Sequence, residues 1–496
     1  MVFSSIPFLY YFLPATLISY FVISWVVYGI VSFFCKDKEL ADRACLFTKN
    51  VVLLCFSLLF YAWGEPKYFF LMAGSVLTFW GCGLGIGYAK TKLQKRIWLW
   101  VSVVAGIMLL TVFKYANFFV ENVNALTGLN ITLLKLTLPV GISFYTFQCM
   151  SYTIDVYRGN AQMQRNPITF GAYVSMFPQL IAGPIVRYVD VARELNNRKH
   201  VWSDMALGLR RLIIGIGKKI LIADNLALLY DKAFVNAQQS SVLFYWMYAL
   251  AFMLYIYFDF SAYSDMAIGM GRIMGFKFIE NFNFPYMSKS VAEFWRRWHM
   301  SLGTWFRDYV YIPLGGNRVS KGRWVFNTMV VWMLTGFWHG ASWNFVLWGL
   351  LYGVCLIIEK WVPALQKLPT VVRHFYTLMI VMLGFVLFNA DSLAMKTGVD
   401  TMTQVIVDFK SLFGFAGLPL VTAETLYYLR SFTPLLIAAI IGCTPLMKNT
   451  ANRLSANPKT STVMSVLEPM FMILVLLVCT GYLVDGAFSA FLYFRF

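Results

Sequence analysis

Long apolar runs alternate with short polar segments along the chain. A helix needs roughly 20 apolar residues to cross the hydrocarbon core of a bilayer. The runs lie near residues 6–34, 50–63, 67–89, 97–113, 137–156, 205–229, 241–263, 324–339, 343–359, 371–389, 431–447 and 464–484. Several are short or broken, so this pattern predicts an all-α, polytopic membrane protein with about ten to twelve membrane helices.

Two segments interrupt this pattern. Residues 158–220 and 276–323 mix Arg, Lys, Pro and Gly with Trp, Tyr and Phe. Irregular backbone at membrane depth must be enclosed by protein or line a wet cavity. We therefore expect interfacial and re-entrant helices around a cavity, within a single transmembrane domain over residues 1–496. The polar stretch 391–411 is expected to be an external loop.

Composition excludes an ordinary soluble enzyme, because 59% of the residues are hydrophobic and only 13% are charged. The net charge of +18 lies in short clusters between apolar runs, without a nucleic-acid recognition motif. Such clusters mark cytoplasmic loops, which places the N-terminus outside. The first two clusters are Lys36, Lys38, Arg43 and Lys49, and Lys90, Lys92, Lys95 and Arg96.

The eight cysteines form no C-x-x-C pair and none lies at metal-ligand spacing from a histidine. We expect no disulfide framework, no metal site and no bound cofactor.

Two of the four histidines are candidates for chemistry. His200 and His374 follow basic residues and are interpreted as solvated residues at the basic edges of membrane helices. His339 lies in an apolar run without a charged residue between Arg323 and Glu359. A buried neutral imidazole can be a packing residue or a general base. The small residues Gly336 and Gly340 could admit a substrate or pack against another helix.

His299 lies in a segment predicted to be one amphipathic helix over residues 291–309. At 100° per residue the aromatic residues share one face, the charged residues share the other, and His299 lies between them. Glu293 and Arg297 are spaced for an i,i+4 pair. This helix could rest at a membrane surface or form the floor of a cavity. The turn after it carries Arg318, Lys321 and Arg323, which suit the phosphates of a coenzyme A donor or reflect cytoplasmic topology.

Several aromatic and basic motifs follow one another in this region. They are Asn281-Phe282-Asn283-Phe284-Pro285-Tyr286, Glu293-Phe294-Trp295-Arg296-Arg297-Trp298-His299, Trp305-Phe306-Arg307-Asp308-Tyr309, Tyr311-Ile312-Pro313-Leu314-Gly315-Gly316-Asn317-Arg318 and Gly336-Phe337-Trp338-His339-Gly340. Together they resemble the signature of the membrane-bound O-acyltransferase (MBOAT) superfamily, in its bacterial alginate O-acetyltransferase and D-alanyl-transfer branch. Residues 279–349 would then hold the catalytic signature.

The resemblance implies a ring of membrane helices around a funnel, in the bacterial cytoplasmic (inner) membrane. His339 maps onto the catalytic histidine and His299 onto the second signature histidine. An acyl group, with acetyl favoured, would pass from acetyl-CoA or another cytoplasmic thioester across the membrane to hydroxyls of an exported polysaccharide. An extracytoplasmic acetyltransferase partner would complete the transfer. We expect Arg296, Arg297, Asn317 and Arg318 to bind the donor.

The C-terminal residues 491–496 resemble an aromatic motif of the same branch, in which a tyrosine carries the acyl group. Tyr493 is thus a third candidate, although an aromatic residue beside Arg495 is also typical of a membrane anchor. The alternatives for the whole chain are D-alanyl transfer to teichoic acid from a carrier-protein thioester, a scaffold without catalysis, and a transporter. A transporter predicts an inverted repeat, and none is found.

Overall fold

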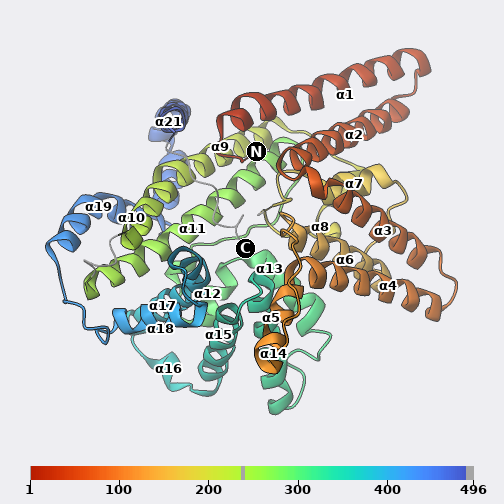
Figure 1. The fold of residues 1–496 in the computed structure, drawn as a ribbon. Helices are drawn as coiled ribbons and strands as arrows, with labels where there is room; N and C mark the ends of the chain where they lie inside the picture. The colour runs from red at the N-terminus through yellow and green to blue at the C-terminus, as the bar shows by residue number, and fades with distance from the viewer. Residues whose placement is uncertain (1, 182, 236–240, 487–496) are drawn as a thin grey trace. The chain divides into compact units, whose positions relative to one another are not determined.

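The computed structural model describes residues 2–181, 183–235 and 241–486 (Figure 1). Throughout these residues the regular secondary structure is helical and contains no strand. The all-α prediction is therefore confirmed.

Nine helical segments of the described chain are long and apolar enough to cross a membrane, which makes the protein a multi-pass membrane protein. They are Pro7–Cys35, Lys38–Gly64, Pro66–Tyr88, Lys92–Thr127, Val242–Ile273, Trp343–Trp361, Thr370–Thr397, Ala423–Gly442 and Pro458–Val484. The other predicted runs are also helical, but their helices are not both long and apolar enough to count as membrane spans. These runs lie near residues 137–156, 205–229 and 324–339.

The chain divides into two compact units. One comprises residues 1–212 and 263–280, and the other comprises residues 213–262 and 281–496. The division falls within two helices, α9 (Trp202–Gly217) and α11 (Val242–Ile273), which contribute to both.

The first unit begins with a helical hairpin of α1 and α2, which run side by side (Figure 1). The turn between them is tight because Lys36 adopts a left-handed conformation and the Asp37 side chain accepts the first backbone N–H groups of α2. The elements of this unit before α9 are η1 (Pro7–Phe12), α1 (Leu13–Cys35), α2 (Lys38–Gly64), η2 (Pro66–Tyr68), α3 (Phe69–Tyr88), α4 (Lys92–Leu110), η3 (Thr111–Tyr115), α5 (Ala116–Thr127), α6 (Ile142–Arg158), α7 (Pro167–Ser175) and α8 (Tyr188–Asn196).

The second unit contains a close helical hairpin of α14 and α15. Its elements besides parts of α9 and α11 are η4 (Lys218–Ala223), α10 (Asp224–Val235), η6 (Pro285–Met287), α12 (Val291–Arg297), α13 (Met300–Phe306), η7 (Arg307–Tyr311), α14 (Lys321–His339), α15 (Trp343–Trp361), α16 (Ala364–Lys367), α17 (Thr370–Thr397), α18 (Thr401–Leu412), α19 (Ala423–Gly442), α20 (Leu446–Ala456) and α21 (Pro458–Val484). The short helix α12 packs against α15, α17 and α13, and α13 also packs against η7.

The predicted external loop at residues 391–411 is wrong, because this stretch is mostly helical. α17 continues to Thr397, and α18 begins at Thr401 after a short turn. Asp400 starts α18 by accepting the backbone N–H groups of Met402 and Thr403. The polar residues that suggested a loop therefore form a helix end and a helix cap.

Candidate active site

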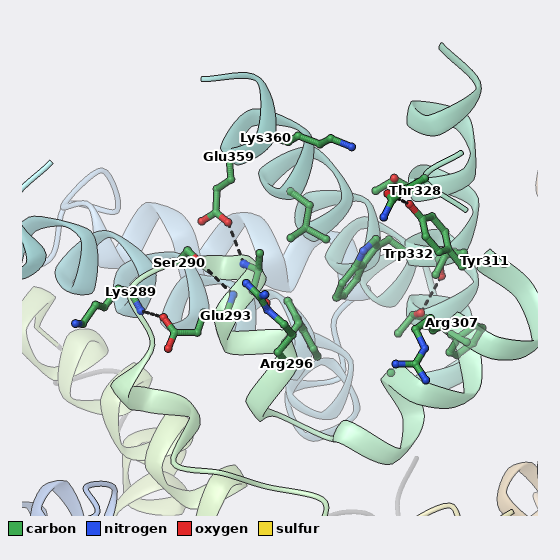
Figure 2. A pocket seen from close by; sticks show the side chains of 18 of the residues that line it. Lys289, Ser290, Glu293, Arg296, Arg307, Tyr311, Thr328, Trp332, Glu359 and Lys360 are labelled. Atoms are coloured by element: carbon green, nitrogen blue, oxygen red, sulfur yellow. Dashed lines mark hydrogen bonds between the residues drawn. The ribbon is translucent and has the colours of Figure 1, made fainter. Parts of the chain in front are cut away.

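The start of α12 is held by two side chains. Ser290 caps the helix by accepting the backbone N–H of Glu293 at 3.0 Å. The buried carboxylate of Glu359, on α15, accepts the backbone N–H groups of Val291 at 2.6 Å and Ala292 at 2.9 Å (Figure 2). A carboxylate at a helix N-terminus satisfies otherwise unpaired donors and complements the helix dipole. Glu359 thus attaches α12 to α15.

The single amphipathic helix predicted over residues 291–309 is instead broken at His299. α12 ends at Arg297, Trp298 is extended, and His299 adopts a left-handed conformation with φ of 44° before α13 begins. A β-carbon makes this conformation costly, so surrounding contacts must hold it. Asn281 provides them, because its backbone carbonyl accepts the N–H of Met300 and its side chain accepts from the same turn. The predicted Glu293–Arg297 ion pair is confirmed, at 2.8 Å.

The hydrogen bonds of Asn281 define the tautomer of His299. The Asn281 Oδ1 atom accepts the backbone N–H of Ser301 at 3.3 Å, and the same oxygen lies 3.0 Å from His299 Nδ1. An amide oxygen can only accept, so Nδ1 carries the proton and Nε2 is the acceptor nitrogen of the ring. Burial lowers the pKa of His299 to about 3, so the imidazole is neutral near pH 7.

His339 is the last residue of α14 and is buried among aromatic rings. The rings of Trp338, Trp348 and Phe388 lie 4.9, 5.1 and 5.2 Å from its own, each edge-on. The space beside Gly336 and Gly340 is filled by α15, since a β-carbon on either residue would collide with Phe345. Of the two interpretations of these glycines, the structure supports close helix packing.

Trp338 lies beside both histidines. Its ring centroid is 6.0 Å from that of His299 and 4.9 Å from that of His339. The sequence separates the two histidines by 40 positions, but one indole contacts both. The structure therefore brings the two predicted histidines to one aromatic cluster.

A cavity of about 1030 Å³ opens beside α12, and His299 lies in its wall. This volume is at the upper end of the range for pockets that hold organic ligands. His339 does not line it. The wall also includes apolar side chains such as Leu302 and Phe306. Charged side chains, among them Arg296, Arg307 and Lys360, lie along it (Figure 2). The five cations are Lys289, Arg296, Arg307, Lys360 and Arg373, and the acids are Glu293 and Glu359.

The four residues predicted to bind a donor lie in different places. Arg296 and Asn317 line the cavity. Asn317 is held there by the hydroxyl of Tyr311, at 2.6 Å, which in turn accepts the indole N–H of Trp324 at 2.9 Å. Arg297 instead lines a separate groove of about 570 Å³ and donates to Glu293 and to the Asn283 carbonyl. Arg318 is exposed and lines neither space.

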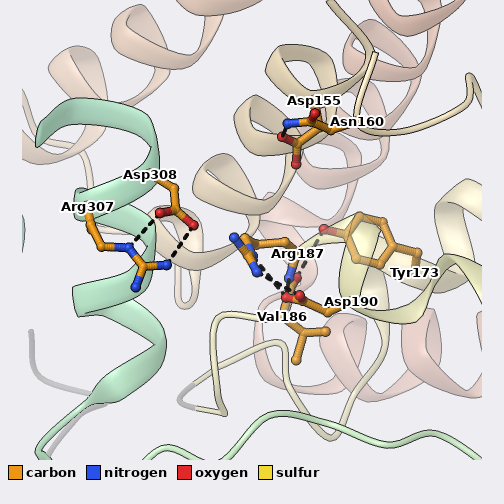
Figure 3. Close-up of polar contacts among 8 residues, drawn as sticks. All are labelled: Asp155, Asn160, Tyr173, Val186, Arg187, Asp190, Arg307 and Asp308. Carbon is orange, nitrogen blue, oxygen red and sulfur yellow. Dashed lines mark hydrogen bonds and ion pairs between the residues drawn. The ribbon is translucent and has the colours of Figure 1, made fainter. Parts of the chain in front are cut away.

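Four cations of the cavity wall were missed by sequence reasoning: Lys289, Arg307, Lys360 and Arg373. Only Arg307 carried a signal, as a charged residue within an aromatic motif. It also bonds the neighbouring Asp308, at 2.7 Å (Figure 3). The others lie on loops and helix ends far apart in the sequence, so that only the fold brings them together.

Three indole or phenol groups near the inner wall have buried polar atoms without a hydrogen-bond partner among the described residues: Trp295 Nε1, Trp348 Nε1 and the Tyr352 hydroxyl. The three rings contact one another, with centroids 4.8 to 5.4 Å apart. Trp295 lines the cavity, and Trp348 contacts His339. Unpaired buried donors are costly, and the N–H of Trp295, which lines the cavity, could donate to a polar ligand there. Tyr493 lies outside the described residues.

This arrangement suits transfer of an acyl group. The cations along the wall can bind phosphates, the apolar part can hold an uncharged arm, and a neutral imidazole can accept a proton. No group of three or more His, Cys, Asp or Glu side chains suited to a metal ion occurs in the described part of the chain. The fold and site thus define a multi-pass membrane protein with a large cavity lined by five cations.

The chain belongs to the membrane-bound O-acyltransferase (MBOAT) family, whose model matches residues 164–390. The match includes both histidines and every residue named in the cavity wall. The protein is therefore an O-acyltransferase, as its sequence motifs predicted.

Relatives within the family act on different polymers, according to their names. The chain is 42% identical to the "Probable alginate O-acetylase AlgI" of Pseudomonas aeruginosa, over 79% of this chain and 73% of the relative. It is 36% identical to the "Peptidoglycan O-acetyltransferase" of Helicobacter pylori, over 79% and 78%. It is 30% identical to the "Teichoic acid D-alanyltransferase" of Bacillus subtilis, over 50% and 68%.

Proposed function

We propose that the protein transfers acetyl groups from a cytoplasmic thioester to hydroxyls of an exported cell-surface polysaccharide. It does so from the bacterial cytoplasmic membrane, with its N-terminus outside and an extracytoplasmic acetyltransferase as partner. The observation that carries the proposal is the cavity, which combines five cations with the neutral imidazole of His299. The higher identity to the two O-acetyltransferases than to the D-alanyltransferase favours acetyl over D-alanyl.

Acetyl-CoA fits the distribution of charge along the cavity wall. Its phosphates bind near Arg296, Arg307 and Lys360, whose charged heads are exposed. Its uncharged arm then reaches the apolar wall around Leu302 and Phe306. There the Nε2 atom of His299 accepts a hydrogen bond from the donor, and the N–H of Trp295 is available to the thioester carbonyl. Asn317 contributes at the rim.

His339 acts as the base for the attacking hydroxyl from beside the cavity, since its ring contacts Trp348, which contacts Trp295 in the cavity wall. As it takes the proton, the hydroxyl oxygen bonds to the carbonyl carbon of the thioester. The carbon–sulfur bond then breaks, the oxygen ester is formed, and the thiolate receives the proton to leave as the thiol. The aromatic rings around His339 exclude water, which would otherwise hydrolyse the thioester.

Tyr493 supplies the first hydroxyl in this proposal. Its phenol accepts the acetyl group, and the resulting aryl ester passes it to the partner. Mass spectrometry of the C-terminal peptide, after incubation with acetyl-CoA and without an acceptor, should show a mass increase of one acetyl group on Tyr493. Repeated absence of that product in active enzyme would limit the proposal to direct transfer.

The test of the function is label transfer from radiolabelled acetyl-CoA in membranes that carry the intact protein, with partner and polysaccharide supplied. His339→Ala and His299→Ala are compared with the unaltered chain at matched expression. We expect labelled polymer from the unaltered chain and loss of label with His339→Ala. Full activity of His339→Ala would overturn the catalytic assignment and favour a scaffold.

A second arm of the test replaces acetyl-CoA by a D-alanyl carrier-protein thioester, with teichoic acid as the acceptor. Transfer in this arm, without transfer of acetyl, would replace the acetyl proposal by D-alanylation.

A further inference from the structure

A second cluster of cations lies in the first unit, outside the cavity. It consists of Lys49 on α2 and Arg198 and His200, which lie between α8 and α9; we call it the Lys49–Arg198 cluster. Lys49 Nζ lies 3.3 Å from His200 Nδ1. Arg198 donates to the side chain of Asn50, the residue after Lys49, at 2.9 Å. Both cations lie over the Tyr20 ring, 5.8 and 5.7 Å from its centroid.

The hydrogen-bond partners of these two cations are neutral. Arg198, only 7% exposed, bonds an amide and the backbone carbonyl of Glu194, and it stacks on Phe276 at 4.3 Å. Its Nε atom is buried without a hydrogen-bond partner in the described part of the chain. Lys49 contacts His200 and the Cys45 thiol.

His200 does not add a third positive charge to the cluster. Burial, together with Lys49 and Arg198, lowers its pKa to about 4, so the ring is neutral near pH 7. The hydroxyl of Tyr20 and the carbonyl of Met274 lie 3.1 and 3.2 Å from His200 Nε2. Because Lys49 must donate to Nδ1, Nε2 carries the ring proton. Asp42, earlier on α2, is exposed, and the described residues show no ion pair between it and Lys49.

Three other cations that are at least partly buried, Arg187, Arg211 and Lys219, have carboxylate partners. Arg187 pairs with Asp190 at 2.8 Å (Figure 3). Arg211 pairs with Asp265 at 2.9 Å and Glu280 at 2.5 Å. Lys219, fully buried, lies 2.7 Å from Asp224 and 2.8 Å from Asp259. A buried charge without a partner carries a large desolvation cost, which an aromatic face offsets only in part.

The backbone of Gly275 lies close to the side chains of Arg198 and His200. Gly275 has φ of 84°, and a β-carbon there would lie 2.7 Å from Arg198 Cγ and 3.2 Å from His200 Nε2. The chain then continues past His200 into Val201 and Trp202, which are 49% and 84% exposed. An exposed Trp at the end of a basic segment is typical of the headgroup level of a bilayer.

We propose that the Lys49–Arg198 cluster binds a phosphate group, as carried by an anionic phospholipid or by free phosphate. The Nε–H of Arg198 and the ammonium of Lys49 donate to its oxygens. Guanidinium and ammonium groups are the usual partners of phosphate, and charge-assisted bonds of this kind are strong. The phosphate supplies the negative charge that the side chains of this cluster lack.

The test uses the full-length protein in detergent after lipid removal. Its probes are phosphatidylglycerol, the diacylglycerol with the same chains but no phosphate, and inorganic phosphate. Native mass spectrometry counts the bound lipid, and thermal unfolding reports stabilisation by each probe. Lys49→Met removes one cation, Lys49→Arg keeps it, and Lys199→Met removes an exposed neighbouring cation with the same change in net charge.

We expect phosphatidylglycerol to bind the unaltered chain, Lys49→Arg and Lys199→Met, and to bind Lys49→Met about tenfold more weakly. The same pattern with inorganic phosphate alone would identify free phosphate as the source. Equal binding by Lys49→Met and the unaltered chain, or equal binding of diacylglycerol and phosphatidylglycerol, would overturn the proposal.

His200→Glu provides a test that does not depend on removing a cation. A carboxylate at this position would replace the phosphate as counter-charge. We expect the lipid-free variant to unfold at a higher temperature than the lipid-free unaltered chain, and to lose phosphatidylglycerol binding. Unchanged binding by this variant would contradict the proposal.

Discussion

The surroundings of the two signature histidines differ in almost every respect, although one indole contacts both. His299 lies in a cavity wall, at a break between two short helices, with polar partners that define its tautomer. His339 ends a long helix, lies among aromatic rings and does not line the cavity. The first position suits contact with a donor, and the second suits a proton transfer from which water is excluded. Under the proposed function, the two similar motifs would therefore have different tasks.

The largest effect is expected on kcat when His339, the proposed base, is replaced. His339→Gln keeps a polar side chain but cannot take the proton, so kcat should fall by about 10² to 10⁴, while KM for acetyl-CoA stays near that of the unaltered chain. Initial rates over a range of donor concentrations measure both constants. His374→Gln, at a histidine that does not line the cavity, is the control. A kcat within twofold of the unaltered value would remove the distinction between the two histidines.

The pH dependence of stability tests whether the His299 ring is neutral in the folded protein. Because its pKa is lowered to about 3 in the folded protein and is near 6.5 when unfolded, the unfolded state binds more protons between these values. The stability due to the neutral ring is fully present above about pH 6.5 and falls by about 1.4 kcal/mol per pH unit below it. Chemical unfolding in detergent at pH 7.5, 6.5 and 5.5 measures this slope.

His299→Asn is the matched variant for that measurement, since it has no group that titrates in this range. Its stability should fall less steeply on acidification than that of the unaltered chain. Equal slopes would show that the ring is not held neutral.

A smaller effect tests the binding of donor phosphates. Arg296 is exposed at the cavity, so Arg296→Ala should raise KM for acetyl-CoA about fivefold, with a smaller effect at high salt. Lys92→Ala, at an exposed cation that does not line the cavity, is the control. If both variants raise KM equally, general surface charge and not the cavity attracts the donor.

The smallest effect concerns the unpaired indole. Trp295→Phe keeps an aromatic ring in the wall but removes the N–H group that has no partner among the described residues. Loss of one neutral hydrogen bond should lower kcat/KM by about threefold. A larger loss for Trp332→Phe, whose Nε1 atom is not among these unpartnered groups, would indicate that ring size and not the N–H matters.

The sequence predicted the fold more completely than the site. Apolar runs identify membrane helices because their length and hydropathy are local properties, and the motifs around His299 and His339 identify the family. The break at His299 was not predictable from a helical wheel, because its conformation depends on Asn281, 18 positions away. For the same reason, no sequence motif identified the cavity cations Lys289, Lys360 and Arg373. Conversely, the sequence grouped Arg297 and Arg318 with Arg296 as donor-binding residues, but neither lines the cavity that Arg296 lines.

The contact between α14 and α15 limits which part of the site can move. A β-carbon on Gly336 would collide with the carbonyl of Phe345, and one on Gly349 with the carbonyl of Trp332, so the two backbones touch without intervening side chains. Such a pair has little freedom to slide or tilt, so His339 at its end should move little. The short helices α12 and α13 meet at a single strained residue and have no comparable contact with each other. Because Glu359 attaches α12 to α15, movement on donor entry and release should fall to α13.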